Sequence, residues 1–94
     1  VNIGTNAGYN ASQKADATNS IAIGYGAYTT ANNQIVLGNA NVDTLITAAI
    51  PIFTRSATPA SSSATGTAGT IQWDANYLYV CTAANTWKRI ALAW

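Results

Sequence analysis

The residues able to carry chemistry are few in this chain and lie far apart. It contains three carboxylates, Asp16, Asp43 and Asp74, one cysteine, Cys81, and neither histidine nor glutamate. A glycosidase needs two carboxyl groups about 5 to 9.5 Å apart, whereas these three lie in three different segments. Pairing them would require a site shared between chains. We therefore predict that the protein is not an enzyme.

The residues needed for cysteine catalysis or for metal binding are also missing. Cys81 has no histidine to activate it as a nucleophile, and its aromatic neighbours predict a buried small side chain. One cysteine and scattered aspartates do not make a metal-ligand set. The turn Gly24–Gly26 is not followed by a lysine or a helix, so it does not match a phosphate-binding loop. We expect no cofactor and no metal.

The charge balance excludes further partners. Charged residues make up 7% of the 94 residues and the net charge is +1, whereas ordinary soluble domains are roughly 25% charged. Nucleic acid is therefore not expected as a partner. No run of about 18 apolar residues occurs, so membrane insertion is not expected either. So little charge is typical of a chain covered by other copies of itself.

The apolar residues are mostly small. Hydrophobic residues make up 49% of the chain, but 19 residues are alanine and only 18 are leucine, isoleucine, valine or phenylalanine. Such a chain buries little bulky surface and is marginal as a lone globule. Because it starts at Val1 within a repeat and lacks methionine, we expect it to be a piece of a longer protein.

The first half of the chain is an internal repeat. Ile21–Gly24 is followed fourteen residues later by Ile35–Gly38, and Val1–Gly4 has the same form of two apolar residues and a glycine. The spacing from the first copy to the second is six residues longer, and we place that insertion within residues 12–19. Short strands at a regular period, joined by glycine and asparagine turns, predict a parallel β-roll or solenoid over residues 1–48.

Alternation along each short strand predicts one aliphatic face. We expect its residues to form the core of the repeat and of an oligomer. They are Ile3, Ile21, Ile23, Ile35 and Leu37.

The second half changes composition twice. Residues 49–69 are rich in alanine, serine, threonine, proline and glycine, which predicts a flexible or extended connector. Residues 70–94 contain three strand candidates separated by turns that end in Asn76 and Asn85, and asparagine tolerates a left-handed backbone. An antiparallel three-stranded meander is predicted. Its faces are both apolar, so other chains should cover them. The expected core residues are Ile71, Leu78, Val80 and Ile90.

Several exposed candidates could contact a receptor. Tyr25 and Tyr28 follow a repeat glycine at the outer edge of the roll. They are either exposed for contact with a receptor or packed over neighbouring repeats. The aromatic residues of the second half could form a sugar-stacking platform with cationic neighbours, or could fill a trimer core. The candidate contacts are Tyr25, Tyr28, Trp87, Lys88, Arg89 and Trp94.

Two sequence patterns carry a resemblance. Ser20–Gly24, with its second copy, resembles the head repeats of trimeric autotransporter adhesins. Ile35–Leu45 resembles a segment common in bacteriophage tail fibres and tail spikes, where a C-terminal chaperone domain often follows; here the chain ends at Trp94 without room for one. Residues 66–89 are similar, more loosely, to the C-terminal tips of phage tail fibres.

This resemblance implies an all-β homotrimeric fibre in which a parallel β-roll precedes a small antiparallel β-meander tip. It implies a non-enzymatic structural and receptor-binding role in the virion tail of a phage. The receptor would be a cell-surface glycan or protein, bound by three equivalent weak sites. Two alternatives remain: the head of a trimeric adhesin on a bacterial surface, and, less favoured, part of a polysaccharide-degrading tail spike.

Overall fold

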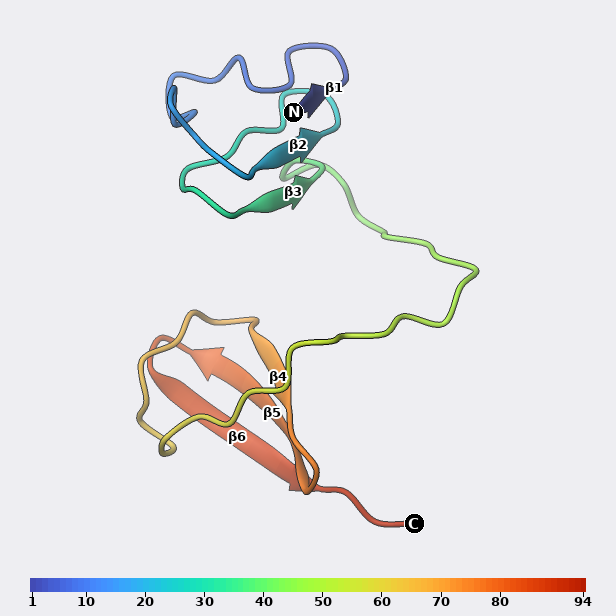
Figure 1. Cartoon of the computed structure of the whole chain (residues 1–94), viewed down its shortest axis with the longest axis vertical. Helices are drawn as coiled ribbons and strands as arrows, with labels where there is room; N and C mark the ends of the chain where they lie inside the picture. The colour runs from blue at the N-terminus through green and yellow to red at the C-terminus, as the bar shows by residue number, and fades with distance from the viewer. The chain divides into compact units, whose positions relative to one another are not determined.

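The computed structural model describes all residues from 1 to 94 and contains six strands and no helix. The strands form two separate three-stranded sheets. The chain divides into two compact units, Val1–Ala48 and Ala49–Trp94, with one sheet in each (Figure 1). The all-β prediction is confirmed. No helix is present that would be long and apolar enough to cross a membrane.

The sheet of the first unit is parallel. Its strands are β1 (Asn2–Ile3), β2 (Ile21–Ile23) and β3 (Ile35–Leu37), in that order (Figure 1). Ala22 pairs with Asn2 on one side and with Val36 on the other, so the register matches the repeat. The predicted parallel strands are confirmed.

Glycine and asparagine occur where the repeat turns. Gly24 follows β2 with φ of 122°, and a Cβ added there would lie 3.1 Å from the Cα atom of Gly38. Asn19 and Asn33 precede β2 and β3 with φ of 51° and 59°. The Asn19 Nδ2 atom donates a hydrogen bond of 2.9 Å to Asn33 Oδ1. These residues therefore allow successive repeats to approach closely and join them through stacked amides.

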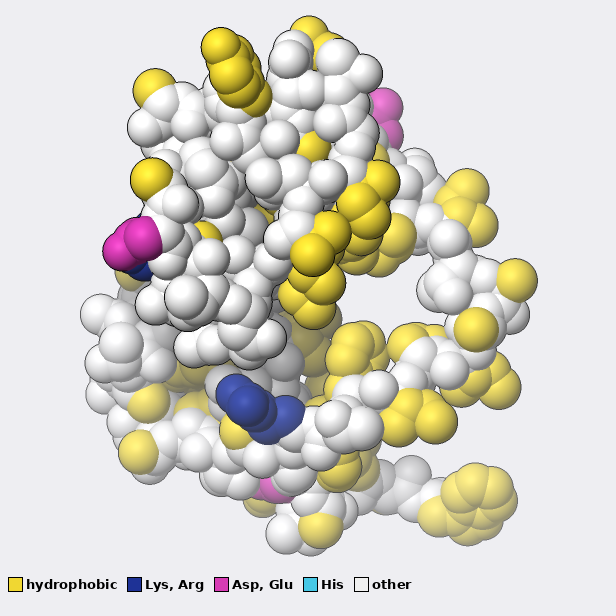
Figure 2. Space-filling view, turned by 45° about the horizontal axis from the view of Figure 1, so that its top comes forward, with side chains coloured by type: hydrophobic (Ala, Val, Ile, Leu, Met, Phe, Trp, Pro, Cys, Tyr) yellow, Lys and Arg dark blue, Asp and Glu magenta, His cyan; other side chains and the backbone are white.

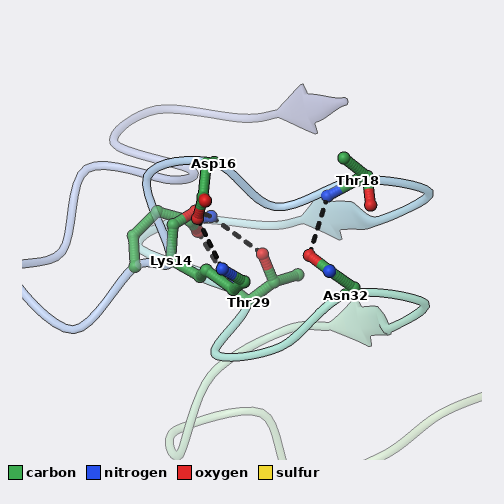
Figure 3. Close-up of polar contacts among 6 residues, drawn as sticks. Lys14, Asp16, Thr18, Thr29 and Asn32 are labelled. Atoms are coloured by element: carbon green, nitrogen blue, oxygen red, sulfur yellow. Dashed lines mark hydrogen bonds and ion pairs between the residues drawn. The ribbon is translucent and has the colours of Figure 1, made fainter.

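The extra residues of the first repeat begin earlier than predicted. Residues 9–13 loop out before Lys14, whose N–H donates to the Thr29 carbonyl at 2.8 Å. Further extra residues precede Thr18, whose N–H donates to the Asn32 side chain (Figure 3). The predicted insertion at residues 12–19 is thus only partly right, because polar composition extends over the whole segment and does not mark its start.

Small side chains fill the interior of the repeats. Ala22, Ala27 and Thr29 are at most 1% exposed. The Gln13 side-chain amide holds Thr29 by donating to its hydroxyl and accepting from its N–H, both at 2.8 Å. The flanking aliphatic side chains of each strand share a face, as predicted, but this face points away from the small interior.

The sheet of the second unit is an antiparallel meander, as predicted. Its strands are β4 (Ile71–Trp73), β5 (Tyr77–Ala83) and β6 (Thr86–Ala91), in that order. Asn85, between β5 and β6, has the expected left-handed backbone with φ of 53°. Asn76 does not: it is absent from the residues with positive φ. A carboxylate stabilises that other turn instead.

Part of the expected connector packs against this sheet. The Trp87 N–H donates to the Ser62 carbonyl at 2.8 Å, and its indole Nε1 donates to the Ala64 carbonyl at 3.0 Å. Gly66 lies against the indole, because a Cβ there would be 2.7 Å from Trp87 Cζ2. This part of the connector is therefore held on the sheet. The buried cluster beneath it consists of Tyr79, Cys81 and Trp87.

We predict that the left-handed turn before β3 distinguishes alanine from glycine. Asn33→Ala should lower the free energy of unfolding by about 1–2 kcal/mol, because alanine lacks the side-chain amide that helps asparagine adopt positive φ and that accepts from Asn19. Asn33→Gly should cost less, since glycine adopts this backbone freely although it also loses the amide contact. Urea unfolding of the full chain, followed by circular dichroism at fixed concentration, measures both.

Asn41→Ala is the control, because Asn41 is exposed and has no positive φ. An Asn33→Ala protein as stable as Asn33→Gly would contradict the role of the backbone.

Candidate functional site

Three of the candidate contacts border one cavity in the second unit. It has a volume of about 300 Å³ and is lined by Trp87, Lys88 and Arg89 together with Tyr79 and the segment 59–62. Tyr79 and Trp87 are 5% and 7% exposed, so they form a buried aromatic floor and do not present open faces for stacking. The residues that remain accessible at this cavity are the two cations and the segment 59–62.

The two cations are not neutralised by carboxylates. The Arg89 guanidinium carbon lies 4.0 Å from the centre of the Tyr77 ring. The chain has one ion pair, between Lys14 and Asp16 in the first unit (Figure 3). Lys88 and Arg89 therefore leave a positive edge on β6.

Asp74 lies in the turn between β4 and β5 and links several parts of the second unit. One carboxylate oxygen accepts the N–H groups of Asn76 and Tyr77 at 2.8 and 2.9 Å, which fixes the β4–β5 turn. The other oxygen accepts the hydroxyls of Thr58 and Tyr79, both at 2.6 Å. Asp74 thus joins the turn, β5 and the segment that crosses the sheet. From the sequence, Asp74 is only one of three separate carboxylates.

These hydrogen bonds shift two pKa values in opposite directions. Donation from Thr58, then from Tyr79 and the turn amides, holds the pKa of Asp74 well below its usual range. Donation to Asp74 raises the pKa of the Tyr79 hydroxyl, and burial adds to this. In the first unit, the hydrogen bond and the charge of Lys14 lower the pKa of Asp16. A general acid at neutral pH needs a raised carboxyl pKa, so neither Asp16 nor Asp74 is arranged as one.

Other reactive groups are similarly occupied. The Cys81 thiol is 1% exposed and lies 3.1 Å from the Ala83 carbonyl, to which it donates. No group of three or more histidine, cysteine, aspartate or glutamate residues could hold a metal ion.

The candidates of the first unit lie in more polar surroundings. Tyr25 is 65% exposed. Tyr28 is half-buried and lines a groove of about 530 Å³. The amide side chains bordering the groove are Asn10, Gln34, Asn39 and Asn41. Tyr9, which the repeat pattern did not single out, is 85% exposed.

The last candidate contact, Trp94, lies in the second unit and is fully exposed at the end of the chain.

The expected core residues are not buried inside the single chain. In the first unit, Ile35 and Leu37 are 67% and 56% exposed. In the second, Ile71 and Ile90 are 65% and 63% exposed, on the sheet face opposite the buried cluster. The remaining members are half-buried or exposed as well: Ile3, Ile21, Ile23, Leu78 and Val80. Their burial by other chains stays a prediction.

Two curated proteins match part of the chain. One is "Depolymerase 1, capsule K30/K69-specific" of Klebsiella phage K5-2, 60% identical over 35 residues, which is 37% of this chain and 4% of that protein. The other is "Depolymerase, capsule K30/K69-specific" of Klebsiella phage K64-1, 50% identical over 34 residues, which is 36% of this chain and 4% of that protein. No protein-family profile matches, and no solved structure matches.

These matches support a phage tail protein and a location in the virion tail. They do not support the resemblance to autotransporter head repeats, and the adhesin alternative is not favoured. The prediction that the protein is not an enzyme is wrong by this comparison, because both relatives are named as depolymerases, which are enzymes. That prediction drew on three carboxylates in a chain that covers only a small part of its relatives.

We predict that Asp74 makes the second unit sensitive to acid. Its pKa is lowered by folding, so its contribution to stability is complete above the unfolded value near pH 4 and is lost as the pH falls toward the folded value. Asp74→Asn should lower the melting temperature most at pH 7 and progressively less toward pH 2. Thermal unfolding of both proteins across this range measures the difference.

Asp43→Asn removes a carboxylate from the first unit and serves as the control. If the effect of Asp74→Asn did not change with pH, the ionised carboxylate would not be the stabilising form.

Proposed function

We propose that the chain is a segment of a homotrimeric, capsule-degrading phage tail protein, in which it holds three chains together and attaches to capsular polysaccharide. The chain spans about 4% of the length of the curated relatives it matches. Their printed names supply the capsule as the target class. The observation that carries the proposal for this segment is its outward aliphatic surface in a chain with almost no charge.

The parallel sheet of the first unit presents two aliphatic rows. Ile21 pairs with Ile35 in one row, and Ile23 pairs with Leu37 in the other, which Ile3 extends. No charged residue lies within the three strands. Contiguous apolar side chains with few charges among them are visible on the surface (Figure 2). The repeats stack in the order β1, β2, β3, so the edge strands of the sheet lie at the two ends of the stack. The aliphatic face is perpendicular to these edges, and we propose that it packs against the same face of two other chains around a threefold axis.

The second unit presents a comparable surface on the sheet face opposite Trp87. A groove of about 910 Å³ runs between Ile52–Ala57 and β4, and Trp73 and Leu78 line it. The Trp73 indole donates to the Phe53 carbonyl at 2.9 Å, which keeps this segment beside the sheet. Large exposed apolar patches mark protein interfaces in soluble proteins. A second copy of the same chain is a suitable partner, because both surfaces are mainly apolar and Arg55 is the one charged residue that lines the groove.

Attachment to a polysaccharide fits the polar parts that remain. Sugars are recognised by amides, hydroxyls and aromatic edges. All three groups border the Tyr28 groove, whereas the cavity beside Trp87 offers hydroxyls and aromatic side chains. Three copies of such sites on one assembly raise avidity without strong single contacts.

We predict a solution mass near three times 9.7 kDa by sedimentation equilibrium. Leu37→Lys should dissociate the assembly, because association would bury three ammonium groups in an apolar interface. Ser12→Lys adds the same charge in the exposed loop and should leave the mass unchanged. A monomeric parent chain, or a trimeric Leu37→Lys protein, would contradict the proposed interface.

We also predict direct attachment to capsule. The full chain should bind at least one member of a panel of Klebsiella capsular polysaccharides that includes types K30 and K69, measured by surface plasmon resonance. Binding should weaken in Leu37→Lys, because dissociation removes avidity. A chain that forms trimers but retains none of these polysaccharides would leave only the structural part of the proposal standing.

A further inference from the structure

We propose that the cavity beside β6 binds an acidic sugar through its carboxylate, with Lys88 and Arg89 as the charged contacts. This inference rests on the proposed attachment function and adds the chemical class of the bound residue. This cavity, the one described above beside Trp87 and here named the β6 cavity, is lined by residues 59–62, Tyr79 and residues 87–89.

The charges of the β6 cavity favour an anion. Lys88 and Arg89 are half of the four cationic side chains of the chain, and both border this cavity. Because they are consecutive in β6, Arg89 lies on the face of Trp87 and Lys88 on the opposite face, so the two cations approach the edge of the strand from its two sides. Neither takes part in an ion pair within the chain. The carboxylate of Asp74 is already saturated by two hydroxyls and two backbone N–H groups. A ligand carboxylate would therefore meet two cations without a competing internal partner, and charge-assisted hydrogen bonds are stronger than neutral ones.

The backbone of the edge strand supplies further donors. The Trp87 N–H points outward from β6, because it donates to Ser62 and not to β5. Alternation in an antiparallel sheet gives Arg89 the same orientation. No carbonyl within the chain accepts the Arg89 N–H. An outward N–H next to a guanidinium suits a carboxylate, which can accept from both.

The remaining walls match the body of a sugar. Pro59 and Ala60 contribute apolar surface, and Ser62 contributes a hydroxyl. The floor is rigid, since the Trp87 indole is fixed by Ala64 and the Tyr79 hydroxyl by Asp74. A volume of about 300 Å³ is at the small end of ligand sites. It admits one sugar residue of a polymer whose neighbours remain outside.

The test compares a uronic-acid oligosaccharide with the same oligosaccharide after its carboxyl groups are reduced to alcohols. Isothermal titration calorimetry on the trimeric chain should show binding of the acidic form at least about tenfold tighter, which corresponds to about 1.4 kcal/mol. The double variant Lys88→Gln/Arg89→Gln should bind the acidic form as weakly as the parent chain binds the reduced form. Raising the salt concentration should weaken only the acidic complex.

The matched control is Lys14→Gln, which removes one cation at a residue that does not line the β6 cavity and is compared with the single variants Lys88→Gln and Arg89→Gln. It should retain the preference for the acidic form. Loss of the preference in this control, or equal binding of both oligosaccharides by the parent chain, would overturn the inference. Circular dichroism and sedimentation confirm that each variant is folded and trimeric.

A parallel measurement on whole capsular polysaccharide separates this inference from the proposed function. If Lys88→Gln/Arg89→Gln binds capsule as tightly as the parent chain, attachment stands and the β6 cavity is not its site. If the parent chain binds no capsule, the proposed function fails. If the parent chain binds neither oligosaccharide, the β6 cavity does not bind sugar.

Discussion

The narrow interior of the first unit is the constraint on which the rest of the structure depends. Glycines after the strands let successive repeats approach so closely that Ala22, Ala27 and Thr29 fill the space inside. The larger aliphatic side chains at both ends of each strand are consequently turned outward. Exposed apolar surface costs roughly 25 cal/mol per Å² relative to burial. Covering these faces with other copies would lower that cost, and an assembled chain has little need of charge for solubility.

The second unit overcomes the same shortage of large side chains in another way. One residue with a buried indole, Trp87, donates hydrogen bonds to two backbone carbonyls of a serine- and glycine-rich segment. One carboxylate, Asp74, fixes that segment to a turn and to β5. Hydrogen bonds thus replace part of the missing apolar burial. Because the segment consists of small residues, it leaves a cavity at the edge of β6. The two cations beside that cavity are exposed as a consequence of this packing.

The sequence predicted local features well and tertiary packing poorly. Parallel and antiparallel strands, the shared aliphatic face and the left-handed Asn85 follow from alternation and turn chemistry over a few residues. The packing of Gly66 on Trp87 could not be predicted, because serine, threonine and glycine are equally common in flexible linkers. The one available signal was the indole N–H, which requires an acceptor when buried. The prediction about enzymatic activity failed because residues within a short segment do not limit the chemistry of a much longer protein.

Weak sites suit a protein that acts on a repeating polymer. A small cavity with two cations gives modest affinity for a single sugar, since charged contacts at the surface are screened by salt. A threefold assembly would present three such cavities to a chain that repeats the same acidic residue. Engagement at one site then raises the effective concentration of polymer at the others. Because each contact remains weak, individual sites release and rebind while the assembly stays attached, so a degrading enzyme would keep its polysaccharide without being trapped at one position.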